Sequence, residues 1–159
     1  MDTMPQFFQN TTNGTLSFAE MITHIKAFLE EDPKAEYSLV IGTDSRIHLV
    51  TAVVVHRKGF GGRYFWYKNI KPKTRTLREK IYAETLTSLD FATNFVPLLK
   101  KSLNGISPKY NLEIHIDVGE HGETREMIRE VVGMITGSGF VAKTKPEAYG
   151  ASYVADKHT

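Results

Sequence analysis

The chain contains no cysteine. This absence excludes a thiol nucleophile, a disulfide framework and cysteine-ligated zinc or iron–sulfur sites, and it best fits an intracellular protein. No apolar run approaches the roughly 20 residues that a membrane-spanning helix needs, so no membrane partner is expected. The first residues, MDTMPQFFQNTTNG, lack a basic region followed by an apolar stretch and predict no secretion signal. We therefore expect a cytoplasmic protein that uses neither thiols nor soft metals.

Net charge is also small, and several common motifs are missing. The 20 Lys and Arg against 18 Asp and Glu give +2 at pH 7, too little to indicate nucleic-acid binding by itself. A GxxxxGKS/T phosphate loop, a GxSxG nucleophile elbow and an HExxH zinc motif are absent. The 159 residues, 41% hydrophobic and 24% charged, are typical of one globular domain. The local arrangement of residues must therefore carry any functional signal.

The order of predicted elements is the most informative pattern. Two capping boxes, Ser17 with Glu20 and Thr76 with Glu79, mark helix starts. Apolar periodicity and turn residues predict helices over 17–31, 76–101, 122–136 and 148–158, and strands over 38–45, 49–57, 63–71, 111–119 and 140–145. After the leading helix the order is βββαβαβα, an antiparallel meander followed by parallel crossovers. We expect an α/β fold: an N-terminal tail over 1–16, then a single domain over 17–159 with an extra helix and a mixed five-stranded sheet flanked by helices.

Two carboxylates follow predicted buried strands. Asp44 ends the strand that carries Leu39, Val40 and Ile41, and Asp117 ends the strand over 111–119. In open α/β sheets, ligands gather beyond the carboxyl ends of the strands. The two aspartates are therefore candidates for one cleft, and the alternative for each is a turn or helix-capping role.

Two further carboxylates lie on predicted helices. At 100° per residue, Glu84 falls inside the apolar arc of its helix, so its charge needs a partner. That partner is either Arg78 or Lys80, or else a metal. Asp156 shares a side of the last helix with small residues that would allow close approach to the sheet, and the alternative is an exposed terminal aspartate.

The four acids together favour one chemistry. A strand-end Asp, a helix Glu, a second strand-end Asp and a C-terminal helix Asp, in this order on βββαβαβα, form the layout of the ribonuclease H fold. There, carboxylates hold two divalent cations that clamp the attacking and leaving oxygens of a phosphodiester displacement. Hard oxygen ligands suit Mg²⁺ or Mn²⁺. We therefore expect Asp44, Glu84, Asp117 and Asp156 to be metal-binding and catalytic residues.

The sequence resembles the YkuK-like family, bacterial and archaeal proteins predicted to adopt a ribonuclease H-like fold. The resemblance covers nearly the whole chain from residue 17 onward and rests on IGTDS at 41–45, the helix around EKIYAETLTS, the segment 114–140, and KPEAYGASYVADKHT at 145–159. It implies the ribonuclease H-like fold, a nuclease role and the same four acids. One departure is that Glu84 lies about two turns into its helix, deeper than the helix glutamate of ordinary ribonucleases H.

Basic residues gather between Arg63 and Lys80, together with four aromatic residues. Such a mixture suits a nucleic-acid backbone with stacked bases, and the alternative is a strand with one core face followed by a solvated loop. Two histidines, near Asp117 and beside Asp156, are candidates for touching phosphate. The predicted substrate-binding residues are Lys71, Lys73, Arg75, Arg78, His121 and His158. His115 shares a strand face with Asp117 and is expected to be partly exposed.

These features predict a divalent-metal-dependent nuclease that hydrolyses phosphodiester bonds of RNA or DNA. The alternative is a non-catalytic nucleic-acid-binding or assembly module that retains the ribonuclease H-like fold. A third possibility, a nucleotide-dependent phosphotransferase of the actin type, is disfavoured because those sites lie between two domains and this chain has one.

Overall fold

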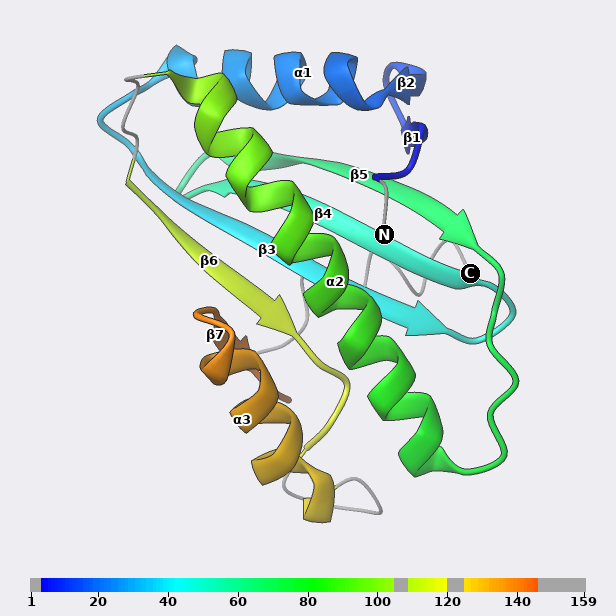
Figure 1. The fold of residues 1–159 in the computed structure, drawn as a ribbon. Coiled ribbons are helices and arrows are strands. Elements are labelled where there is room, and N and C mark those ends of the chain that lie inside the picture. Colours follow the sequence, from blue (N-terminus) through cyan, green and yellow to red (C-terminus); the bar gives the residue numbers. More distant parts are fainter. Residues whose placement is uncertain (1–3, 105–108, 120–124, 146–159) are drawn as a thin grey trace.

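The computed structural model describes residues 4–104, 109–119 and 125–145. Over these residues a mixed sheet carries helices on one face (Figure 1). The helices are α1 Phe18–Glu31, α2 Leu77–Leu103 and α3 Ile128–Gly137, the last preceded by a 3₁₀ turn, Arg125–Met127. The strands are β1 Phe7–Asn10, β2 Gly14–Ser17, β3 Glu36–Ser45, β4 Leu49–Arg57, β5 Gly61–Asn69, β6 Lys109–His115 and β7 Val141–Lys143.

The sheet differs from the predicted one in its number of strands. Over the described ranges it has seven, in the order β2-β1-β5-β4-β3-β6-β7, rather than five. Strands β3, β4 and β5 form the predicted antiparallel meander, and β6 and β7 extend it by parallel pairing with β3 and with each other. The expected core order is therefore confirmed, and the count is corrected by two N-terminal strands.

Those two strands replace part of the tail expected over residues 1–16. Strands β1 and β2 form an antiparallel hairpin that joins the sheet through β5. The Asn10 side-chain oxygen accepts hydrogen bonds from the backbone N–H groups of Thr12 and Asn13, both at 2.9 Å, and Gly14 supplies a left-handed residue with φ +71°. Residues 7–17 are few and largely polar, so their apolar pattern is weak. Pairing of β1 with β5 stabilises these residues as a pair of strands.

The leading helix begins as predicted. The Ser17 hydroxyl accepts from the Glu20 backbone N–H and the Glu20 carboxylate accepts from the Ser17 N–H, both at 3.1 Å. This reciprocal pair satisfies two of the helix's unpaired N–H groups. Because Ser17 also ends β2, α1 follows the hairpin directly and lies on the same face of the sheet as α2 (Figure 1).

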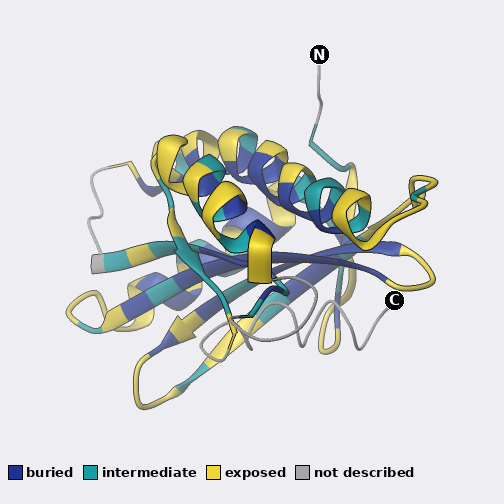
Figure 2. Ribbon diagram, turned by 90° about the horizontal axis from the view of Figure 1, so that it is seen from below, coloured by how far each residue is buried: buried dark blue, intermediate teal, exposed yellow. Residues whose placement is uncertain are grey.

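The central strands of the sheet are buried along much of their length (Figure 2). Alternation along these strands separates two apolar clusters. Leu39 and Ile41 of β3 pack with α1, α2 and α3 in the main core. Val40, together with Trp66 of β5, belongs to a smaller cluster on the other face. Successive residues of a strand point to opposite faces. The last residues of β3 therefore supply side chains to both sides of the sheet.

Two boundary predictions need correction. Strand β6 ends at His115, so Asp117 lies two residues beyond the strand rather than at its end. The third helix begins with a 3₁₀ turn at Arg125 and becomes α-helical only at Ile128. The predicted helix over 148–158 lies outside the described residues. In the part of the chain that the structure describes, no helix is long and apolar enough to cross a membrane.

Candidate functional site

The carboxyl end of β3 is an unusually polar stretch of buried strand. Thr43, Asp44 and Ser45 are 5%, 9% and 2% exposed. The Thr43 hydroxyl lies 2.9 Å from the Thr51 hydroxyl on β4 and 2.7 Å from the Ser88 hydroxyl on α2. These contacts place the Thr43 side chain on the helix-covered face. Since neighbouring residues of a strand alternate, Ser45 shares that face, and Asp44 lies on the opposite one.

Glu84 reaches the end of β3 from α2. Its Oε2 atom accepts hydrogen bonds from the Ser45 backbone N–H at 2.8 Å and from the Ser45 hydroxyl at 2.7 Å. Glu84 is 4% exposed, which confirms the prediction that it lies inside the apolar arc of α2. The Glu84 carboxylate thus accepts hydrogen bonds from Ser45, whereas Arg78 pairs with Glu130 of α3 at 2.8 Å. A strand-end serine therefore supplies hydrogen bonds to Glu84. Of the partners considered from the sequence, Arg78 is engaged by Glu130, and Lys80 acts on Glu84 through its charge.

The environment of Glu84 disfavours its ionised form. Burial raises the pKa of this carboxyl to about 7. The Ser45 hydroxyl opposes the rise, the negative charge of Asp44 adds to it, and Lys80 weakly opposes it. Asp44 and Glu84 thus approach the end of β3 from the two faces of the sheet and repel each other electrostatically. A cation near both would offset this unfavourable interaction.

Asp117 follows the neighbouring parallel strand. It lines a narrow recess together with Thr43 and Glu84, so residues from β3, α2 and the end of β6 meet there. The Asp117 carboxylate also forms an ion pair of 2.5 Å with the Lys145 ammonium. Both side chains are partly exposed, at 38% and 59%, so this pair is accessible to water and salt.

His115 is buried at the same end of β6, contrary to the expectation of partial exposure. It is 6% exposed and lies opposite Gly42 of β3, which puts it on the Asp44 face of the sheet. Its Nε2 atom lies 3.1 Å from the Glu113 carboxylate, and its buried Nδ1 atom has no hydrogen-bond partner among the described residues. Burial lowers the pKa of His115, although Glu113 opposes this effect. A neutral ring that donates from Nε2 to Glu113 leaves an acceptor lone pair on Nδ1.

The sequence predicted partial exposure of His115 because strand alternation shows which face of the sheet a residue lies on, but not what covers that face. The polar pair His115 and Glu113, two residues apart on one strand face, was the available signal. Three predicted site residues, Asp156, His121 and His158, lie outside the described residues. Of the four predicted acids, the structure therefore brings Glu84 close to Asp44 and to Asp117.

The comparisons with known proteins agree with this layout. A family model described as Ribonuclease H-like matches residues 20–159. The chain belongs to the ribonuclease H-like family. It is also 32% identical to the uncharacterized protein YkuK of Bacillus subtilis (strain 168), over an alignment of 166 positions that covers 96% of each protein. No solved structure matched the chain.

Ribonuclease H-like membership makes a divalent metal the group to test against these residues. Across residues 4–104, 109–119 and 125–145, no three His, Asp or Glu side chains are grouped closely enough to hold a metal ion. The donor chemistry nevertheless fits a hard cation, because all three described acids offer carboxylate oxygens. The charge also fits, because Glu84 is buried beside Asp44 with its ionised form destabilised.

The basic residues of this ribonuclease H-like chain lie on an exposed loop and helix start. Lys73, Arg75 and Arg78 line an open groove with Leu86 of α2. Lys71 instead donates to the Arg46 carbonyl at 2.6 Å. The prediction that the aromatic residues of this segment stack on bases is wrong for Phe65 and Trp66, because these two side chains are 1% and 8% exposed.

Proposed function

We propose that this protein is a divalent-metal-dependent nuclease that hydrolyses phosphodiester bonds of RNA or DNA. The observation that carries the proposal is the pair Asp44 and Glu84. A buried glutamate whose charge is opposed by burial and by a second acid is a costly structural choice. Membership of the ribonuclease H-like family gives this pair a chemical purpose.

Asp44, Glu84 and Asp117 would hold Mg²⁺ or Mn²⁺, with Asp156 as the fourth ligand. Divalent cations supply Lewis-acid stabilisation of the phosphoryl oxygens and lower the pKa of water. Within the protein, Ser45 holds one oxygen of Glu84 with its N–H and hydroxyl groups. The other oxygen of that carboxylate then faces the recess shared with Asp117 in the binding state we propose.

Lysine and arginine side chains would position the substrate. Lys73, Arg75 and Arg78 line one groove at the start of α2, and Lys71 lies just before it. Such side chains bind phosphates without reading sequence. The proposed roles of His121 and His158 are contacts with phosphate near the acids. His115, with its buried Nδ1 lone pair, is positioned to accept a hydrogen bond on the Asp44 face.

The test of the proposal is cleavage by the purified protein. Labelled single-stranded RNA, single-stranded DNA and an RNA–DNA hybrid are incubated with Mn²⁺, with Mg²⁺ and with chelator. We expect products with a metal and none with chelator. Cleavage that persists undiminished in chelator contradicts the metal role.

A second candidate function is a non-catalytic nucleic-acid-binding or assembly module. The observation that favours it is the ion pair between Asp117 and Lys145, which neutralises one of the acids. This alternative predicts salt-sensitive binding of nucleic acid with no cleavage by any metal. The same labelled substrates, followed by gel shift and by product formation, separate the two functions.

Replacing Lys145 with glutamine is expected to tighten Mn²⁺ binding by up to about fivefold, the effect of removing one exposed ion-pair partner. The ammonium group competes with a cation for the Asp117 carboxylate. Mn²⁺ titration followed by electron paramagnetic resonance measures the change. Lys100→Gln is the control, because Lys100 is exposed near the C-terminal end of α2. It should leave the Mn²⁺ affinity unaltered. Weaker Mn²⁺ binding by Lys145→Gln would show that the lysine supports the site.

A further inference from the structure

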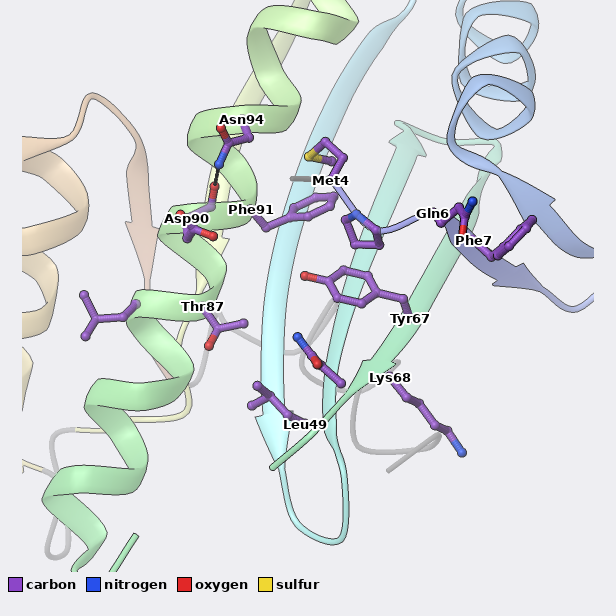
Figure 3. Close-up of a pocket in the computed structure, with 13 residues that line it drawn as sticks. Met4, Gln6, Phe7, Leu49, Tyr67, Lys68, Thr87, Asp90, Phe91 and Asn94 are labelled. Atoms are coloured by element: carbon purple, nitrogen blue, oxygen red, sulfur yellow. Dashed lines mark hydrogen bonds between the residues drawn. The ribbon is translucent and has the colours of Figure 1, made fainter. Parts of the chain in front are cut away.

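A cavity of about 890 Å³ lies between α2, the end of β5 and the segment before β1 (Figure 3). Leu49 lines it and pairs across the sheet with Ser45, the residue that donates to Glu84. Thr87, which also lines it, follows Glu84 by less than one helical turn. The cavity therefore lies one strand away from the candidate site.

The two walls of the cavity combine flat rings with hydrogen-bonding groups. Tyr67 extends from β5 toward α2, where Phe91, Thr87 and Asp90 form the opposite wall (Figure 3). The rings of Tyr67 and Phe91 pack against each other, with centroids 5.6 Å apart and an interplanar angle of 37°. Because Phe91 is buried, the half-buried Tyr67 ring supplies the aromatic surface of the cavity. Asn94 and Gln6 add amide groups to the lining.

The charges of the lining disfavour a phosphate inside the cavity. Asp90 contributes a carboxylate, and its negative charge helps to raise the pKa of Tyr67, after burial as the main cause. Lys68 belongs to the lining, but its side chain points away from the helical wall (Figure 3). A ligand of this cavity is therefore flat, apolar on its faces, and rich in hydrogen-bond donors on its edge.

The groove that carries the cations borders this cavity at one residue of α2. Leu86 of α2, which is 54% exposed, lines both the cavity and the basic groove of Lys73, Arg75 and Arg78. A nucleotide chain consists of a charged phosphate backbone and uncharged bases. A backbone bound along the groove would therefore place one of its bases in the cavity. Stacking on aromatic side chains and edge recognition by amides and carboxylates are how proteins bind unpaired bases.

We propose that this cavity holds an unpaired nucleobase of a single-stranded nucleic acid whose backbone follows the basic groove. The inference rests on the proposed nucleic-acid substrate and names its form. A base within a duplex has its edge engaged by its partner and its faces stacked, so the cavity selects single strands, or strand ends, next to the carboxylates.

The experiment measures binding by fluorescence anisotropy, in chelator so that no cleavage occurs. The probes are a labelled single-stranded oligonucleotide of about 12 nucleotides, within the usual site sizes, and the blunt duplex of the same sequence. Leu86→Glu places a negative charge where groove and cavity meet. Leu98→Glu is the matched control, because Leu98 is also exposed on α2, at 40%, and lies outside the cavity lining.

We expect the wild type to bind the single strand more tightly than the duplex. Leu86→Glu should weaken single-strand binding at least about tenfold, the scale of one lost stacking contact, while Leu98→Glu changes it less than about twofold. Asp90→Asn should lower the ratio of oligo(C) to oligo(U) affinity, because a carboxylate accepts from the cytosine amino group. This ratio would not respond to a merely structural role.

Several results would overturn the inference. They are unchanged single-strand binding in Leu86→Glu, duplex bound as tightly as the single strand, or AMP bound as tightly as the oligonucleotide. The outcome is separable from the nuclease proposal. Binding through the cavity without cleavage keeps the inference and defeats the nuclease, whereas cleavage with unchanged binding in Leu86→Glu does the reverse.

Discussion

Asp44→Asn is expected to reduce Mn²⁺-dependent cleavage at least about 100-fold, the upper end of what supporting residues cost at metal sites. Asp44 is a buried acid at the carboxyl end of β3, next to the serine that holds Glu84. Asparagine keeps the shape of the side chain and removes its charge, so a direct metal ligand is weakened without a cavity. Initial rates at saturating Mn²⁺ measure the loss, and the Mn²⁺ dissociation constant should rise in parallel.

The control for Asp44→Asn is Glu30→Gln, which neutralises an exposed carboxylate paired with Lys26 on α1, away from the recess. It should cleave like the wild type. Circular dichroism and the thermal midpoint show whether Asp44→Asn is folded. A folded Asp44→Asn protein with wild-type rates would remove Asp44 from the metal site and favour the binding-module function.

Glu84→Gln is expected to stabilise the metal-free protein at pH 8 by about 3 kcal/mol. The pKa of Glu84 rises from 4.5 to about 7 on folding, and each unit corresponds to about 1.36 kcal/mol. The folded state therefore holds its proton to higher pH than the unfolded state. Stability is lost as pH rises from about 4.5 through 7, and the loss is complete above the folded pKa.

Glutamine removes this loss, because it is uncharged at every pH and its carbonyl oxygen still accepts from the Ser45 N–H and hydroxyl groups. Urea unfolding at pH 5, 6, 7 and 8 in chelator is the measurement. The two proteins should have similar free energies of unfolding at pH 5 and diverge above it. A wild type that gains stability relative to Glu84→Gln between pH 5 and 8 would mean that the folded protein favours the ionised carboxylate.

Mn²⁺ should reverse the order of stability of the wild type and Glu84→Gln. A cation bound by Glu84 favours the ionised carboxylate, so Mn²⁺ at pH 8 should stabilise the wild type and stabilise Glu84→Gln much less. A site that costs stability without its ligand is a known compromise between stability and function. Glu30→Gln, which neutralises an exposed glutamate paired with Lys26 on α1, is the control and should follow the wild type with and without Mn²⁺.

The local features of the fold were predictable because their causes lie within a few residues. The capping box of Ser17 and Glu20 is a three-residue relationship, and the structure contains both of its hydrogen bonds. The meander of β3, β4 and β5 follows from apolar runs separated by short turns. The buried position of Glu84 follows from helical periodicity alone.

Features that depend on distant partners were not predictable. The hairpin of β1 and β2 has a weak apolar pattern, and its place in the sheet comes from pairing with β5. Whether His115 is exposed depends on what covers its face of the sheet, which strand alternation does not specify. Lys145 reaches Asp117 because β6 and β7 pair in parallel.

The sequence by itself determined the order of the core elements and which acids follow strands or face the core, because each of these is a periodic or short-range property. Only the tertiary structure decided which residue satisfies each acid. Glu84 is held by Ser45, 39 positions away, and it approaches the end of β3 on the face opposite Asp44. The physical reason is that a buried charge takes the donors which packing brings to it, and packing joins residues from separate elements. The absence of cysteine with which the sequence began removes thiolate ligands, so carboxylate oxygens and histidine nitrogens remain for any metal. The fold places three acids around the ends of two adjacent parallel strands.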